Sequence, residues 1–119
     1  MDNKRIYLHT EFAITPGKLN EFKKIAQELM EIVEEKEPKT LRYQFYLNKD
    51  QTKAYVVEEY PNTAALRTHV FHAALSVRKI LHVSKVTRFT ALGKLHRVPT
   101  KVLTTSGAQN FQYWNGLDR

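Results

Sequence analysis

The sequence predicts an α+β fold in which two helices cover one face of a four-stranded antiparallel sheet. Alternating apolar residues predict four strands, and apolar residues at three- and four-residue steps predict two helices. Turn residues between these segments divide them in the order β-α-β-β-α-β. Right-handed crossovers then give the ferredoxin-like arrangement, and 119 residues are enough for one such domain with one core.

The first strand and helix are predicted within residues 5–37. Apolar and polar residues alternate from Arg5 to Ile14, and Thr10 is the only polar residue on the apolar face. Thr15 and Pro16 are typical of an N-cap and a first helical position, so we expect the helix to begin there. The charged segment 34–37 before Pro38 is expected to be its solvated last turn.

A hairpin and a second helix are predicted next. Alternation over 41–47 and a second strand over 54–60, joined by a polar turn, predict the hairpin. Asn62 is a candidate N-cap for a helix that continues to Leu81, with a kink expected near 71–74.

The last strand is predicted over residues 86–95, which are rich in β-branched and aromatic side chains. We divide the chain into a domain at 1–97 and a C-terminal extension at 98–119. The extension contains a predicted helical turn at 100–105 and an aromatic segment at 111–114. Because large aromatic side chains are costly to leave in water, we expect this segment to dock over the helices of its own subunit or on a dimer.

One face of the predicted sheet has no helix to cover it. Its side chains are large and partly aromatic, and they come from three strands: Tyr7, His9, Gln44, Tyr46, Tyr55 and Val57. Such a face is expected to pack on a second copy of the chain, which predicts a homodimer.

Composition excludes several classes of protein. The absence of cysteine excludes disulfides, thiolate zinc sites and cysteine nucleophiles, and no apolar run is long enough to span a membrane. We therefore expect a cytoplasmic protein.

The net charge of +7 comes from the second half, because residues 61–119 contain nine basic residues and only one acidic residue, Asp118. This basicity indicates a solvated surface or attraction for an anionic substrate. Because no nucleic-acid-binding motif is present, we expect no nucleic-acid partner.

Residues 12–17, the Val57-Glu58-Glu59-Tyr60 strand end and the helix start at 62–69 together resemble the antibiotic biosynthesis monooxygenase domain, a branch of the dimeric α+β barrel superfamily. The resemblance covers about residues 5–95. It implies a homodimer with a pocket between sheet and helices in each subunit. It also implies oxidation of phenols, quinols or polycyclic aromatic compounds by molecular oxygen without a prosthetic group.

Some relatives in the superfamily degrade haem, using an Asn on the first strand, a Trp in the second helix and a His beyond it. In this sequence Thr10 and Leu66 stand where that Asn and that Trp are expected. The departure argues against haem degradation.

Two histidines are the candidate catalytic residues. A cofactor-free oxygenase must deprotonate its phenolic substrate, and a His that titrates near neutral pH suits that task. His69 and His72 lie three apart on the second helix and are expected to face the pocket. The candidate substrate-binding residues are Thr10, Tyr43, Asn62 and Leu66. In the structural alternative, His69 packs at the core edge and His72 is solvated.

The spacing of these histidines does not predict a metal site, because no third protein ligand accompanies them in the helix. We therefore expect neither metal nor cofactor. The leading interpretation is a cofactor-independent monooxygenase that acts on a small aromatic, possibly anionic molecule. The alternative is a non-catalytic dimeric protein of the same fold that binds a ligand or regulates.

Overall fold

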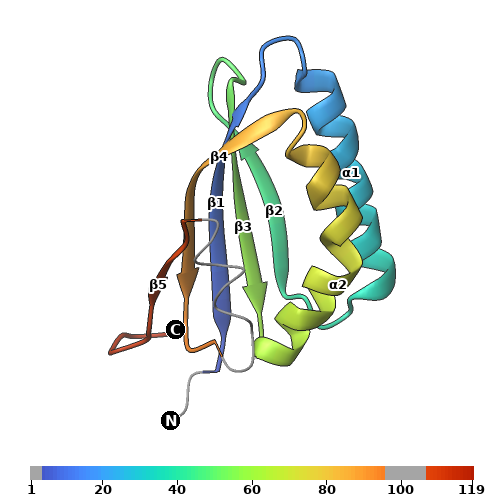
Figure 1. Ribbon diagram of the computed structural model, residues 1–119. Helices are drawn as coiled ribbons and strands as arrows, with labels where there is room; N and C mark the ends of the chain where they lie inside the picture. Colours follow the sequence, from blue (N-terminus) through green and yellow to red (C-terminus); the bar gives the residue numbers. More distant parts are fainter. Residues whose placement is uncertain (1–3, 96–106) are drawn as a thin grey trace.

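The computed structural model describes residues 4–95 and 107–119 and has two layers, a sheet and a pair of helices (Figure 1). The predicted element order is confirmed, and both helices lie on the same face of the sheet. The elements are β1 (Ile6–Ile14), α1 (Leu19–Lys36), β2 (Arg42–Leu47), β3 (Lys53–Tyr60), α2 (Thr63–Ile80), β4 (Ser84–Leu92) and β5 (Gln109–Phe111).

The sheet has five strands in the order β2-β3-β1-β4-β5, and the first four are antiparallel as predicted. The expected total of four strands is wrong, because β5 adds to the outer edge of β4 in parallel. The Gly93 N–H donates to the Phe111 carbonyl at 2.8 Å, and the Asn110 amide donates to the carbonyls of Ala91 and Gly93. Three residues are too few to show alternation, so only pairing with β4 reveals this strand.

The core lies between the sheet and the helices. Along β1 every second residue is buried, as the alternation predicted, and Thr10 is the buried polar member of that face. One apolar cluster is built around Phe22 and Leu29 of α1, and a second is built around Ile6, Tyr60 and Leu66. Residues of both clusters border the cavity described below.

The helix ends differ from two predictions. α1 begins at Leu19, with Lys18 as an N-cap that makes no side-chain hydrogen bond, so the expected start at Thr15 and Pro16 is wrong. Gly17 has φ +82°, and this left-handed backbone separates Pro16 from the helix. α2 runs without interruption through 71–74, so the expected kink is absent there.

The start of α2 and the end of β4 are each set by a specific residue. Asn62 caps α2 as predicted, since its Oδ1 accepts the Ala65 N–H at 2.9 Å. β4 ends at Leu92 rather than at Leu95, because Gly93 takes φ +112° and turns the chain. The predicted helical turn at 100–105 lies outside the described residues.

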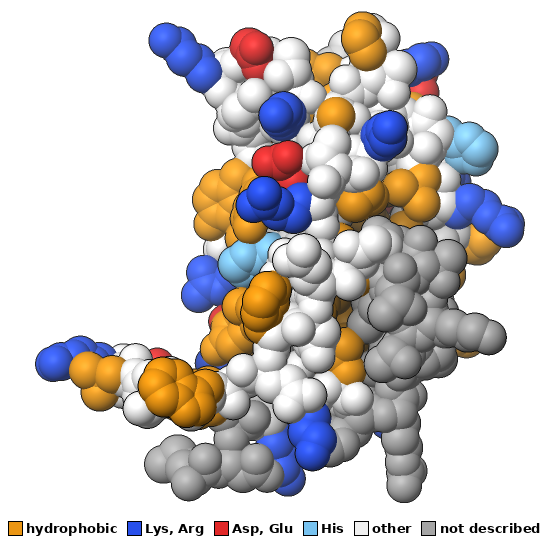
Figure 2. All heavy atoms as spheres, turned by 60° about the vertical axis from the view of Figure 1, so that its left-hand side comes forward, with side chains coloured by type: hydrophobic (Ala, Val, Ile, Leu, Met, Phe, Trp, Pro, Cys, Tyr) orange, Lys and Arg blue, Asp and Glu red, His pale blue; other side chains and the backbone are white. Residues whose placement is uncertain are grey.

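The second face of the sheet carries no helix (Figure 1). Figure 2 brings this side forward and shows hydrophobic and basic side chains interspersed on it. Tyr46 is half exposed, and His9 Nδ1 lies 3.0 Å from the Tyr55 hydroxyl. Among the described residues, neither helix is long and apolar enough to cross a membrane.

The described part of the C-terminal extension lies at the edge of the sheet. After β5 the chain projects away from the body (Figures 1 and 2), and the Trp114 side chain is 90% exposed. The expectation that the aromatic segment docks over the helices of its own subunit is therefore wrong for residues 107–119.

Gly93 is a position where glycine is required. A Cβ added there would lie 2.6 Å from the Arg5 carbonyl oxygen, and φ is +112°. Gly93→Ala is expected to destabilise the fold by about 2 kcal/mol or more, which lowers the melting temperature by roughly 8 °C. Gly116→Ala is the matched control, since its added Cβ meets only ordinary contacts at 3.8 Å. Equal melting temperatures for the two variants in thermal denaturation would contradict this account.

Candidate active site

A cavity of about 380 Å³ lies between α2 and the sheet. Fourteen of its eighteen lining residues are apolar, and they come from both helices and from four strands. The four polar lining residues are Thr10 of β1, Tyr43 of β2, Glu58 of β3 and His69 of α2. A mostly apolar pocket with a few convergent polar groups is the usual form of a small-molecule site.

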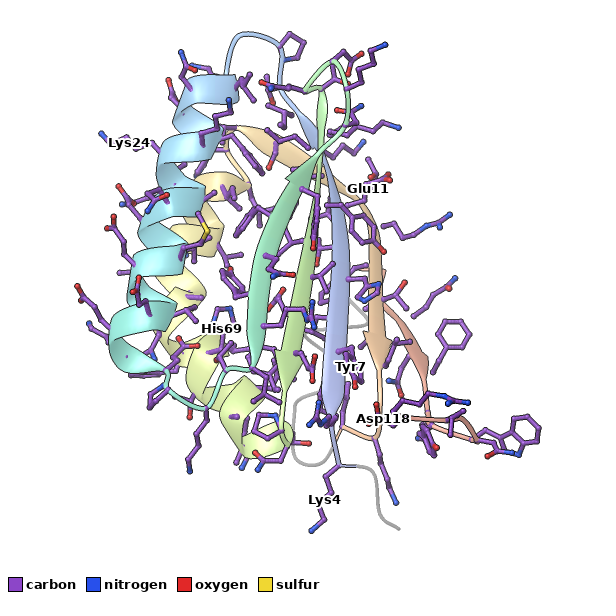
Figure 3. All side chains as sticks on the ribbon, turned by 180° about the vertical axis from the view of Figure 1, so that it is seen from behind. Lys4, Tyr7, Glu11, Lys24, His69 and Asp118 are labelled. Carbon is purple, nitrogen blue, oxygen red and sulfur yellow. The ribbon has the colours of Figure 1, made fainter. Side chains whose placement is uncertain are left out.

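Strand register brings the polar residues together. Tyr43 pairs with Glu58 across β2 and β3, and Glu58 pairs with Leu8 of β1, two residues before Thr10. Side chains of directly paired residues lie on the same face of a sheet, so all three polar groups point toward the helices. His69 lies between α2 and the sheet (Figure 3).

The His69 imidazole is held by a buried carboxylate. Its Nδ1 lies 2.8 Å from Glu37 Oε1, and His72 Nδ1 lies 3.1 Å from Glu37 Oε2. The Thr40 hydroxyl donates to Oε1 at 3.0 Å. With Nδ1–H donated to the carboxylate, the second ring nitrogen of His69 presents its lone pair, which is the form a general base needs.

Glu37 is only 4% exposed, so the prediction of a solvated last turn is wrong at this residue. It directly follows α1, and its N–H still donates to the Val33 carbonyl. The chain turns at Pro38, and the side chain passes to α2 rather than into solvent. Two imidazoles and one hydroxyl replace the water that a carboxylate loses on burial.

A second buried carboxyl group lies on the other side of His69. Glu58 Oε1 is 3.5 Å from His69 Nε2 and accepts the Tyr60 hydroxyl at 2.5 Å. Burial raises the pKa of Glu58. His69 and the hydrogen bond from Tyr60 oppose this rise, and the nearby charge of Glu37 adds to it. Burial is also the main cause of the raised pKa values of the Tyr43 and Tyr60 hydroxyls, which therefore remain hydrogen-bond donors.

Three polar atoms of this group open to the cavity. Within 4–95 and 107–119, every side-chain nitrogen or oxygen sealed from solvent has a hydrogen-bond partner. The hydrogen bonds among these described residues leave Thr10 Oγ1, Tyr43 Oη and Glu58 Oε2 unused. These atoms are therefore accessible from the cavity, where a ligand can complete their bonding.

The structure separates the candidate residues into two groups. Thr10, Tyr43, Leu66 and His69 line the cavity, as their assignment requires. Asn62 and His72 do not line it. Asn62 spends its side-chain oxygen on the α2 cap. His72 was expected to face the pocket, but its ring bonds to the far oxygen of Glu37.

Sequence analysis missed Glu37 and Glu58. Glu58 could have been found, because it shares the inward face of β3 with Ala54, Val56 and Tyr60, where a carboxylate needs a reason to be buried. Glu37 is one of four consecutive charged residues and gives no comparable signal. Among the described residues, no three His, Asp or Glu side chains are grouped as a metal site.

The sequence of residues 5–75 matches the family described as antibiotic biosynthesis monooxygenase. The chain belongs to this family. The matched segment runs from β1 into α2 and contains all four polar lining residues of the cavity. The resemblance inferred from the sequence is thus confirmed. No curated protein matches the chain.

Solved structures share the fold at low sequence identity. MupZ from Pseudomonas fluorescens is 22% identical with a TM-score of 0.83, and the match covers 98% of this chain and 96% of MupZ. SnoaB, a cofactor-independent oxygenase from Streptomyces nogalater, is 11% identical with a TM-score of 0.65, covering 81% of this chain and 98% of SnoaB. A candidate antibiotic biosynthesis monooxygenase from Caulobacter crescentus is 20% identical with a TM-score of 0.66. The match covers 79% of this chain and 92% of the Caulobacter protein.

Glu37→Gln tests the support of His69. A neutral amide offers one acceptor where the carboxylate accepts from three groups, so buried donors lose partners. We expect a loss of about 1–3 kcal/mol in the free energy of unfolding, measured by urea denaturation. Glu34→Gln, one turn earlier on the exposed side of α1, should change it by less than about 0.5 kcal/mol. Equal stability of both variants would contradict a structural role for the Glu37 carboxylate.

Proposed function

We propose that this member of the family is a cofactor-independent monooxygenase that acts on a phenol- or quinol-like aromatic molecule. One observation carries the proposal: a histidine oriented by a buried carboxylate faces an apolar cavity in which hydroxyl and carboxyl groups lack partners. The family match supports the reaction class. SnoaB, which shares the fold, is a cofactor-independent oxygenase, and this agrees with the proposal.

The proposed chemistry begins with proton transfer. His69 Nε2 takes the phenolic proton, while Glu37 stabilises the resulting imidazolium through Nδ1. The substrate anion is electron-rich and can pass an electron to molecular oxygen, which then bonds to the ring. Conversion of a phenol to a quinone in this way consumes one O₂ and releases one water.

The cavity suits an aromatic substrate. Its walls include Phe12, Phe45 and Phe89, which offer flat apolar surface to a ring system. The volume of about 380 Å³ lies in the usual range of roughly 300–1,000 Å³ for small-molecule sites. Apolar walls also exclude water, which strengthens the electrostatic interactions of the His69 site.

Oxygen uptake measured against a panel of quinols and polycyclic phenols tests the function. We expect uptake of one O₂ per molecule oxidised, and His69→Ala should lower turnover by roughly 10²–10⁴-fold while the fold is retained. His82→Ala is the matched control, since His82 is exposed beyond the end of α2. Ligand binding without oxygen uptake would instead support the non-catalytic alternative.

The assembly that accompanies this function is proposed to be a homodimer, formed through the sheet face that lacks a helix. A second copy would also cover the exposed Trp114 and Tyr113 of the extension. Light scattering at micromolar concentration should give about twice 13.9 kDa. Val57→Glu, which places a charge on the uncovered face of β3, should shift the mass toward the monomer. A wild-type monomer would refute the assembly.

A further inference from the structure

We infer that Tyr43 and a protonated Glu58 together bind one substrate oxygen as hydrogen-bond donors, and that the substrate is an aromatic ketone with an acidic C–H next to its carbonyl. His69 removes that proton. This inference rests on the proposed function, because it concerns the same site, and it narrows the substrate from any phenol-like molecule to compounds that react as the keto tautomer.

The geometry gathers the three groups around one part of the cavity. Tyr43 and Glu58 are direct cross-strand neighbours on the inward face of the sheet. The ring centroids of Tyr43 and His69 are 4.8 Å apart, and His69 Nε2 is 3.5 Å from the Glu58 carboxyl. The hydroxyl of Tyr43 and the second oxygen of Glu58 are two of the three polar atoms that the hydrogen bonds leave unused in the site. In the proposed complex the substrate oxygen lies beside both atoms and its adjacent carbon faces Nε2.

The surroundings of the two buried carboxyl groups favour the proposed protonation of Glu58. Glu37 is compensated by two imidazoles and a hydroxyl. Glu58 accepts one hydroxyl, from Tyr60, and His69 Nε2 lies 3.5 Å from it. Two carboxylates on either side of one buried imidazole repel each other, so the less compensated group takes the proton.

The groups that face Glu58 are His69 from α2, Glu37 from the end of α1, Tyr43 from β2, Tyr60 from β3 and the neutral Thr10 from β1. β4 contributes only the apolar Val86 and Phe89 to the lining. Burial is the largest cause of the raised pKa of Glu58 and the Glu37 charge adds to it, whereas His69 and the hydrogen bond from Tyr60 oppose the rise.

Two neutral donors suit a carbonyl oxygen on which negative charge develops. When His69 Nε2 takes the proton, the C–H electron pair forms the carbon–carbon double bond of an enolate and the charge moves to oxygen. Preorganised donors in a site that excludes water stabilise that charge strongly. The same pair, a tyrosine with a carboxylic acid kept neutral by an apolar site, performs this role in ketosteroid isomerase. With O₂, the enolate of a CH₂ compound gives a new carbonyl group and one water.

Hydrogen–deuterium exchange tests the inference without oxygen chemistry. 2-Tetralone is incubated with the protein in D₂O under nitrogen, and loss of its α-proton signals is followed by NMR. The wild-type protein should accelerate exchange, and His69→Ala should abolish the acceleration. Tyr43→Phe should lower it by roughly 10²–10³-fold, as expected for loss of one oxyanion donor. Tyr46→Phe, on the uncovered face of β2, should leave the rate unchanged.

Glu58 variants separate a donor role from a structural one. Glu58→Gln keeps a neutral donor, so exchange should stay within about tenfold of wild type, whereas Glu58→Ala should lose roughly 10²-fold. In the wild-type protein the rate should fall as rising pH ionises Glu58, and Glu58→Gln should remove that fall. Glu34→Gln is the control, and thermal melting verifies that each variant is folded.

The outcomes distinguish the two proposals. Exchange that depends on Tyr43 and Glu58, without oxygen uptake for any compound, supports the inference and refutes the oxygenase. Oxygen uptake that depends on His69, with wild-type exchange rates in folded Tyr43→Phe and Glu58→Ala, overturns the inference alone. No exchange by the wild-type protein above the rate of His69→Ala also overturns it. If the fall in rate with rising pH persists in Glu58→Gln, the protonated Glu58 is refuted.

Discussion

The bond between the Glu37 carboxylate and the His69 imidazole joins the end of α1 to the middle of α2, and the arrangement of the candidate site depends on it. The carboxylate also accepts from His72, so it fixes two successive positions on the same helix face. A buried carboxylate is tolerated because these donors replace its water, and removing one donor leaves a charge without compensation. The bond therefore stabilises the packing of the two helices and orients the ring nitrogen that faces the cavity.

The antiparallel sheet supplies the second half of the site. Direct pairing of Tyr43 with Glu58 across β2 and β3 ensures that a phenol and a carboxyl group are adjacent on the inward face, whatever the rotamers around them. In the proposed chemistry the helix layer contributes the base and the sheet contributes the donors, and apolar residues from both layers line the cavity between them. Membership of the antibiotic biosynthesis monooxygenase family does not by itself specify this division of roles, because one fold supports many reactions.

Much of the fold was predictable because its signals are local. Alternation identified β1 and the hairpin, Asn62 identified the start of α2, and the inward face of β1 predicted the burial of Thr10. The failures are long-range. β5 exists through pairing with β4, and Glu37 is buried because a helix distant in sequence offers it two imidazoles. His69 and Tyr43 were identified by their spacing. Glu58 could be identified only because a carboxylate on the apolar face of a strand is unusual.

The cavity also affects how long the folded chain survives. It borders both apolar clusters, so space that packed side chains could fill in a 119-residue protein is left open. A molecule that binds only the folded state adds stability through mass action, about 2.7 kcal/mol at a concentration one hundred times its Kd. Occupancy then sets the fraction of chains that open transiently, and with it exposure to proteases. A ligand that fills the cavity would thereby raise the cellular abundance of the protein.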